Sequence, residues 1–209
     1  MKTIKFLTSL FIISILTFSC AKDDPAPAPN PNAVKQEFEN KTETTIVDAS
    51  IGQTGQTDSF LEVNANGILT DLSKMTLEIK LKHSFAKDLA LILIPPGVGA
   101  KPSKKGLING YENCFIFRVG RSDDYVETNL LRFNTSFTDV MTIQNNTIAA
   151  GNFKESRGDS ELQVLNSLFK ELKDKKVNGS WNLRIYDFNG SDTGNLISWK
   201  LIFEPGAIQ

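Results

Sequence analysis

The chain has 209 residues, of which 40% are apolar and 22% are charged, a composition typical of one globular domain with appendages. Its formal net charge is −1 and no stretch forms a basic stripe, so the composition argues against nucleic-acid binding. The 14 glycines, the 14 phenylalanines and the scarcity of helical periodicity favour β structure.

Residues 1–19 are predicted to be a signal peptide. Lys2 and Lys5 provide a positive start, and the apolar stretch 6–18 is too short to span a bilayer comfortably. Ser19 directly before Cys20 resembles the lipobox of bacterial lipoproteins, with threonine at position 17 where that motif usually has leucine. The resemblance implies that Cys20 is acylated, which anchors the chain to a membrane without spanning it. The alternative is ordinary secretion with a free Cys20.

A tether is predicted over residues 20–45. The run Ala21-Lys22-Asp23-Asp24 resembles the signal that sends some Gram-negative lipoproteins to the outer face of the outer membrane, and the alternative is a merely solvated run of charges. Residues 25–33 alternate proline with small residues, which favours extended polyproline II structure. Residues 34–45 are polar, so the folded domain is predicted to span 46–205.

The predicted strands begin with two short runs, 46–51 and 59–64. Residues 75–83 then alternate apolar and polar side chains, the pattern of an amphipathic strand. Residues 88–97 are almost wholly apolar up to Pro95-Pro96-Gly97, which predicts a strand that is buried on both faces or central in a sandwich.

One helix is predicted from Ser160 to Asn178-Gly179, with Lys173, Lys175 and Lys176 at its negative C-terminal end. Ser160 and Gln163 form a capping box, and Asn178-Gly179 marks the stop after it. Apolar residues recur at helical spacing: Leu162, Leu165, Leu168, Phe169 and Leu172. The helix is expected to cover one edge or end of the domain, and a partner-binding helix is the alternative.

Both tryptophans lie in the last two predicted strands, 181–186 and 197–203. Each run alternates apolar and mostly polar residues, and a polar, glycine-rich turn over 187–194 joins them. The sequence therefore predicts a hairpin that commits Trp181 and Trp199 to one core.

These segments together resemble the P domain (P/Homo B domain), which follows the catalytic domain in kexin- and furin-like proprotein convertases and in many bacterial subtilisin-like proteases. The first motif of that family is matched by His83, Ser84, Asp88, Leu89, Leu91, Leu93, Pro95 and Gly97. Two later motifs are matched by Gly179, Trp181, Leu183, Ile185 and Asp187, and by Gly194, Leu196, Trp199 and Leu201.

The resemblance covers roughly residues 46–203 and is least over 98–132. It implies an all-β, jelly-roll-type β-sandwich with one short amphipathic helix. It also implies that several motif residues are structural: His83, Asp88, Trp181, Asp187, Gly194 and Trp199.

The chain is predicted not to be an enzyme. A Ser-His-Asp triad needs a histidine base, and the one histidine, His83, has a structural role in the resemblance. In the convertases, the protease chemistry belongs to the subtilisin-like domain that precedes the P domain. Cys114 is predicted to be a buried reduced thiol, since lipidation of Cys20 leaves it without a partner.

Calcium is the cofactor that the sequence suggests. Asp187, Asn189 and Ser191 have the one-three-five oxygen spacing of a calcium loop, but the glycine and bidentate glutamate of an EF-hand are missing. The alternative is a hydrogen-bonded turn. Because some P domains bind calcium, the resemblance leaves these candidate Ca²⁺ ligands: Asp88, Asp187, Asn189 and Asp192.

The favoured function is a non-catalytic binding or interaction module, tethered to the outer membrane and facing the cell exterior. Its partner would be a protein or a glycan, with binding loops sought first within 98–132. The alternative implied by the resemblance is an accessory subunit that stabilises or targets a secreted subtilisin-like protease. A hydrolase in its own right is the third hypothesis.

Overall fold

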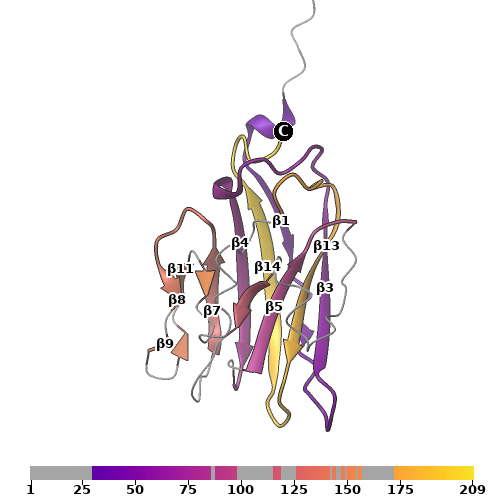
Figure 1. Ribbon diagram of the computed structural model, residues 1–209, viewed down its shortest axis with the longest axis vertical. Helices are drawn as coiled ribbons and strands as arrows, with labels where there is room; N and C mark the ends of the chain where they lie inside the picture. Colours follow the sequence, from indigo (N-terminus) through magenta and orange to yellow (C-terminus); the bar gives the residue numbers. More distant parts are fainter. Residues whose placement is uncertain are drawn as a thin grey trace, which may run out of the picture.

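The structure is a computed structural model that describes residues 30–85, 88–97, 115–118, 126–141, 143–144, 147–148, 150–153, 155–156 and 172–209. In this part of the chain two β-sheets pack face to face as a sandwich (Figure 1). The six-stranded sheet has the order β1 (Gln36–Asn40), β14 (Gly194–Phe203), β4 (Met75–His83), β7 (Val126–Phe133) and β11 (Gly151–Phe153), and β2 (Thr44–Thr45) also pairs with β14. The four-stranded sheet has the order β3 (Gly55–Val63), β13 (Gly179–Asp187), β5 (Leu89–Ile94) and β6 (Phe115–Arg118).

Shorter elements complete the described secondary structure. They are the 3₁₀ helices η1 (Pro31–Ala33) and η2 (Leu72–Lys74) and the strand pairs β8 (Val140–Met141) with β12 (Glu155–Ser156) and β9 (Ile143–Gln144) with β10 (Thr147–Ile148). The predicted all-β sandwich is confirmed. Among the described residues, no helix is long and apolar enough to cross a membrane. Most of the predicted helix lies outside them, and its predicted C-terminal end is wrong, because residues 172–178 form a turn in which Asp174 has a φ of 63° and Lys176 forms a β-bridge with Ile68.

The core forms where the alternating apolar side chains of the two sheets meet. The apolar face of β4 is fully buried, which confirms the amphipathic strand predicted over 75–83. Every residue of β5 is buried, as its continuous apolar sequence predicts. The four bulkiest fully buried side chains are Trp181, Trp199, Phe133 and Phe203. Burial of one large apolar side chain contributes about 1.5–3 kcal/mol, so this layer is the main source of stability.

The predicted hairpin of the last two strands is wrong. β13 pairs with β3 and β5 in one sheet, whereas β14 pairs with β1 and β4 in the other. The segment between them, residues 188–193, carries the chain across the sandwich. Alternation correctly identified the buried face of each strand, but it does not specify which strand lies alongside. As a result, Trp181 and Trp199 face the core from opposite sheets.

The predicted start of the folded domain near residue 46 is also wrong. β1 lies within the predicted tether and pairs antiparallel with β14 over all five of its residues. Phe38 packs edge-on against Phe203, with ring centroids 6.2 Å apart. Phe38 is the one large apolar residue of β1, so the strand shows no apolar alternation in the sequence. Residues 1–29, with the predicted signal peptide and Cys20, lie outside the described residues.

The last residue of β1 and the segment after it cover the free edge of β3. Asn40 Nδ2 donates to the Phe60 carbonyl oxygen at 2.7 Å, and the Val47 amide donates to Thr57 Oγ1 at 2.8 Å. Gly55 allows this approach, because an added Cβ would lie 1.9 Å from the Val47 oxygen. The run 46–51, predicted to be a strand, contains no strand and ends in a turn closed by hydrogen bonds between Ser50 and Gln53. The exposed backbone of an edge strand is thereby protected.

The loops gather at two ends of the sandwich (Figure 1). The proximal end, where the chain arrives from its N-terminal part, consists of residues 30–35, 64–74, 172–178 and 204–209. The distal end consists of residues 41–54, 84–85, 88 and 188–193. The strands run between these ends, so a tether attached at Asn30 leaves the distal loops farthest from its attachment point.

We predict that a chain beginning at residue 46 is less stable than one beginning at residue 30 by about 2 kcal/mol or more. The shorter chain loses the β1 ladder and the half-buried Phe38 ring, whose burial and cross-strand contacts carry energies of that order. Urea unfolding of both chains measures the difference. Equal unfolding free energies would show that β1 is dispensable and would contradict its place in the sheet.

Candidate functional site

A buried histidine and a buried aspartate join the two sheets at the distal end. His83 ends β4 in the six-stranded sheet, and Asp187 ends β13 in the four-stranded sheet. His83 Nε2 lies 3.2 Å from Asp187 Oδ2, and neither side chain has exposed surface. The two atoms are close but poorly aligned for a hydrogen bond, so the attraction is mainly electrostatic. The contact fixes the end of one sheet against the end of the other.

The backbone next to His83 determines its tautomer. The Phe85 amide donates to His83 Nδ1 at 3.2 Å, so Nδ1 is the acceptor of the neutral ring. The ring proton is therefore inferred to be on Nε2, where it points toward the Asp187 carboxylate. Nδ1 therefore has a hydrogen-bond donor, whereas Nε2 has only the electrostatic contact with Asp187.

Gly194 leaves room for the histidine ring. It pairs with His83 across the β14–β4 ladder. A Cβ added at this position would lie 2.2 Å from His83 Cδ2 and 2.5 Å from the Lys82 oxygen. Only glycine fits such a close approach, which gives the family-motif glycine a physical reason.

Residues 188–193, the crossing segment, carry the chain from β13 to β14. Three of the four candidate calcium ligands meet where this segment begins. Asn189 Nδ2 donates to Asp88 Oδ1 at 2.7 Å, and the Asn189 amide donates to Asp187 Oδ1 at 3.2 Å. The fourth, Asp192, instead accepts a hydrogen bond from Ser84 Oγ at 2.9 Å. Ser84 Oγ accepts in turn from the Thr193 amide at 2.9 Å. These side chains fasten the crossing segment to the turn after β4.

The described contacts among these side chains form a hydrogen-bonded turn. The side-chain amide of Asn189 donates to Asp88 Oδ1 and its backbone amide donates to Asp187 Oδ1, so a donor occupies one oxygen of each carboxylate, whereas Asp187 Oδ2 has no hydrogen-bond partner. Within the described ranges, no group of three or more His, Cys, Asp or Glu side chains is arranged to hold a metal ion. Calcium ligation requires six to eight oxygens directed at one point.

Both tryptophans are core residues with a satisfied indole. Trp181 Nε1 donates to the Val177 oxygen at 2.8 Å. Trp199 Nε1 donates to Ser59 Oγ at 2.9 Å, which links β14 to β3 across the sandwich. Their relative exposures of 0% and 1% leave no aromatic surface for a ligand.

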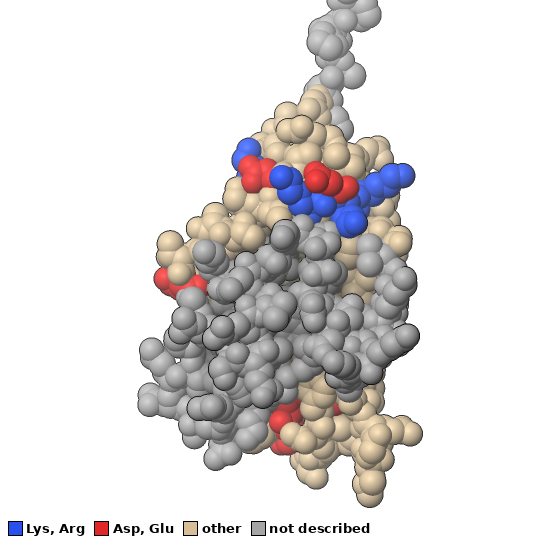
Figure 2. Space-filling model, in the orientation of Figure 1, with Lys and Arg blue, Asp and Glu red and all other residues tan. Residues whose placement is uncertain are grey.

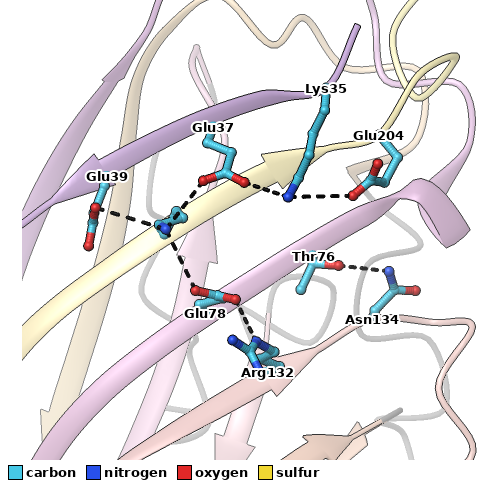
Figure 3. A network of polar contacts seen from close by, with 9 residues as sticks. Lys35, Glu37, Glu39, Thr76, Glu78, Arg132, Asn134 and Glu204 are labelled. Atoms are coloured by element: carbon cyan, nitrogen blue, oxygen red, sulfur yellow. Dashed lines mark hydrogen bonds and ion pairs between the residues drawn. The ribbon is translucent and has the colours of Figure 1, made fainter.

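A network of charges on the outer face of the six-stranded sheet has no counterpart in the sequence predictions (Figure 3). Lys200 Nζ lies 3.3 Å from Glu37, 3.9 Å from Glu39 and 3.9 Å from Glu78. Arg132 extends the row, with Nε 2.5 Å from Glu78 Oε1. The register places Glu39, Lys200, Glu78 and Arg132 opposite one another on successive strands. The sequence signal for this network was the charged residues at alternate positions of the strands. That signal could be used only if β1 had been recognised as a strand.

These charges neutralise one another. A hydrogen bond from Lys35 is the main cause that lowers the pKa of Glu37, and the same bond raises the pKa of Lys35. Cross-strand pairs of opposite charge each contribute roughly 0.2–1 kcal/mol to a sheet. The network therefore aligns β1 with the sheet and presents no uncompensated charge to a ligand.

The outer face of the four-stranded sheet carries a second paired group. Arg184 donates to both oxygens of Asp58, at 2.6 and 3.1 Å, and Asn182 donates to Asp58 Oδ1 at 2.7 Å. Burial acts to raise the pKa of Asp58, but hydrogen bonds from Arg184, Asn182 and Gln56 outweigh it and hold the pKa below its usual value. Asn182 Oδ1 is buried without a hydrogen-bond partner. Here too the charges are internally compensated.

Comparison with known families decides what this sandwich resembles. Residues 142–203 match the family model of the proprotein convertase P-domain. The match contains the motif residues Trp181, Asp187, Gly194 and Trp199 and confirms the resemblance predicted from the sequence. The P domain is a non-catalytic companion domain of subtilisin-like proteases. Comparison with curated proteins gave no significant match.

Several predicted features lie outside the described residues. They are Cys20, Cys114 and most of the loop region 98–132.

We predict that His83→Leu lowers the free energy of unfolding by on the order of 3 kcal/mol, because it leaves the buried Asp187 carboxylate without its counterpart. Chemical denaturation measures the loss. Ser84→Ala, which removes one hydrogen-bonding group at the neighbouring partly buried position, is the control and should cost about 1 kcal/mol. A His83→Leu effect no larger than that of Ser84→Ala would refute the structural role of the pair.

Proposed function

We propose that the chain is a non-catalytic, lipid-anchored P-domain module that binds a partner at the cell surface. The observation that carries this proposal is the match of residues 142–203 to the P-domain family, whose members accompany proteases without performing their chemistry. The partner is a protein or a glycan. The outer membrane, with the domain facing the exterior, is the proposed location.

The environment of His83 supports the non-catalytic part of this proposal. A general base must reach the proton that it removes from a substrate. His83 has 1% exposure, and its two ring nitrogens face Asp187 and the Phe85 amide. The ring thus holds the fold together and is not available to a substrate.

The position of the N-terminal part of the domain supports the tether. Asn30 lies at the proximal end, and residues 20–29 separate it from Cys20 (Figure 1). Acylation of Cys20 would place the proximal end toward the membrane and the distal loops toward the surroundings. A single acyl chain gives only marginal anchoring, whereas the several chains of a bacterial lipoprotein anchor stably.

An accessory role for a separate protease is the second candidate, and the P-domain match is the observation that favours it. Purification of the tagged chain from solubilised outer membranes distinguishes the two functions. Stoichiometric recovery of a subtilisin-like protease supports the accessory role. Recovery of a different protein or of a glycan supports the general interaction module, and recovery of the chain alone argues against both.

We predict that Cys20→Ser moves the protein from the membrane fraction to the soluble fraction and abolishes labelling by radioactive palmitate. The acylated sulfur is absent in this variant, whereas the matched control Cys114→Ser keeps it and should stay in the membrane. Fractionation and labelling of cells that express each variant make the measurement. Membrane association of Cys20→Ser without acylation would overturn the proposed anchor.

The melting temperature of the domain tests whether it binds calcium. A ligand that binds only the native state must raise the melting temperature. Because Asn189 already donates to one oxygen of Asp88 and to one oxygen of Asp187, we expect the same melting temperature in chelator and in millimolar calcium. A rise in calcium that disappears in Asp187→Asn would show that the distal cluster binds the ion after all.

A further inference from the structure

The proximal end is a continuous, ordered surface made from segments that lie far apart in the sequence. The Leu69 amide donates to the Lys175 oxygen at 2.9 Å, and the Ile68 amide donates to the Gln209 oxygen at 2.8 Å. The Gly206 amide donates to the Asn32 oxygen at 3.3 Å. These backbone hydrogen bonds hold the C-terminus, the turn before β13 and the start of the domain in fixed relative positions.

This surface carries exposed lysines without ion-pair partners. Lys173, Lys175 and Lys176 lie in one exposed turn, and none of them forms an ion pair within the described ranges. Asp174 lies in the same turn, so three positive and one negative charge give the turn a net charge of +2. Figure 2 shows the basic side chains gathered at the end where the tether arrives, with some acidic side chains among them. The remaining described lysines of this end are paired: Lys35 with Glu37 and Glu204, and Lys74 with Asp71.

Exposed aliphatic side chains belong to the same surface. Val34 is 63% exposed and Ile68 is 39% exposed. Ile68 forms a β-bridge with Lys176, so an apolar and a basic side chain lie next to each other. Aliphatic residues flanked by lysines are typical of protein surfaces that bind at a membrane interface, where the lysines face anionic headgroups.

The short connection to Cys20 limits the distance of this surface from the bilayer. Residues 20–29 would span at most about 31 Å as polyproline II, whereas a tether that reached residue 45 would have spanned roughly 80 Å. Because β1 belongs to the domain, the connection is the shorter of the two. Asn32 and Asn178 both donate to Asn66, so the turn that carries the lysines and the start of the described chain lie at the same end of the sandwich.

We propose that the proximal end docks on an anionic lipid surface, the face of the membrane in which Cys20 is anchored. This inference rests on the proposed lipid anchor and adds an orientation to it. Lys173, Lys175 and Lys176 contact the lipid phosphates, and Val34 and Ile68 enter the headgroup layer. The distal end has exposed aliphatic residues as well, Val47 and Ile51, but they lie beside the acidic Asp48, so the same lipid would repel it.

Vesicle binding of the unlipidated chain tests the proposal. The probe is a vesicle of equal parts phosphatidylglycerol and phosphatidylcholine, compared with phosphatidylcholine alone, and the protein is the chain from residue 20 with Cys20→Ser. We expect binding to the anionic vesicles only and a decrease as salt is added. Lys173→Gln, Lys175→Gln and Lys176→Gln together should weaken binding on the order of 100-fold, from about fivefold per lysine.

Two matched controls make the result specific to this end. Lys41→Gln, Lys80→Gln and Lys82→Gln remove the same number of charges elsewhere and should leave binding nearly unchanged. Val34→Ser should weaken binding severalfold, whereas Val47→Ser, a similarly exposed valine at the distal end, should not. Absence of binding to the anionic vesicles, or equal losses in the two lysine triples, would overturn the docking surface. Either result leaves the lipid anchor itself to the separate Cys20→Ser experiment.

Discussion

The rest of the structure depends on the crossing of the chain from β13 to β14. Within residues 188–193 the chain leaves one sheet and enters the other, so the two tryptophan-bearing strands face each other across the core. The crossing is fixed at its start by the His83–Asp187 contact and at its end by Gly194, which has no side chain to displace the His83 ring. Between these two points, the hydrogen bond from the Ser84 hydroxyl to the Asp192 carboxylate holds the crossing segment in place. These polar groups therefore maintain the geometry on which the apolar core is built.

The same physical chemistry limits where a partner can bind. On each outer sheet face a group of charges is paired internally, as in the row through Lys200 and in the bidentate contact of Arg184 with Asp58. Paired surface charges contribute little to binding, because a ligand would have to displace an existing partner. The two ends differ: at the proximal end Lys173, Lys175 and Lys176 form no ion pair with another described residue, and the distal end has exposed aliphatic residues near acids. An anchored domain with two chemically different ends is suited to attach at one end and to present the other.

The sequence predicted the features that depend on local patterns and missed those that depend on tertiary pairing. The strands β4 and β5 were predictable because the alternation in one and the continuous apolar run in the other fix their burial. The strands that pair with β14 were not predictable, because alternation identifies the buried face of a strand but not the strand beside it. β1 was missed because Phe38 alone marks its inner face. In the candidate site, the spacing of Asp187 and Asn189 was a local signal in the sequence, but the contact of Asp187 with His83 joins two sheets and has no local signal.

The central proposal is that the domain is anchored by its proximal end with the distal loops facing the cell exterior. Labelling of intact cells with a membrane-impermeant maleimide tests it most directly, with Ile51→Cys as the reactive site in a Cys114→Ser background. Ile51 is fully exposed at the distal end, and an acylated Cys20 cannot react. The account predicts labelling of intact cells to the same extent as of lysed cells. Labelling that appears only after lysis would place the distal loops inside the cell envelope and would contradict the account.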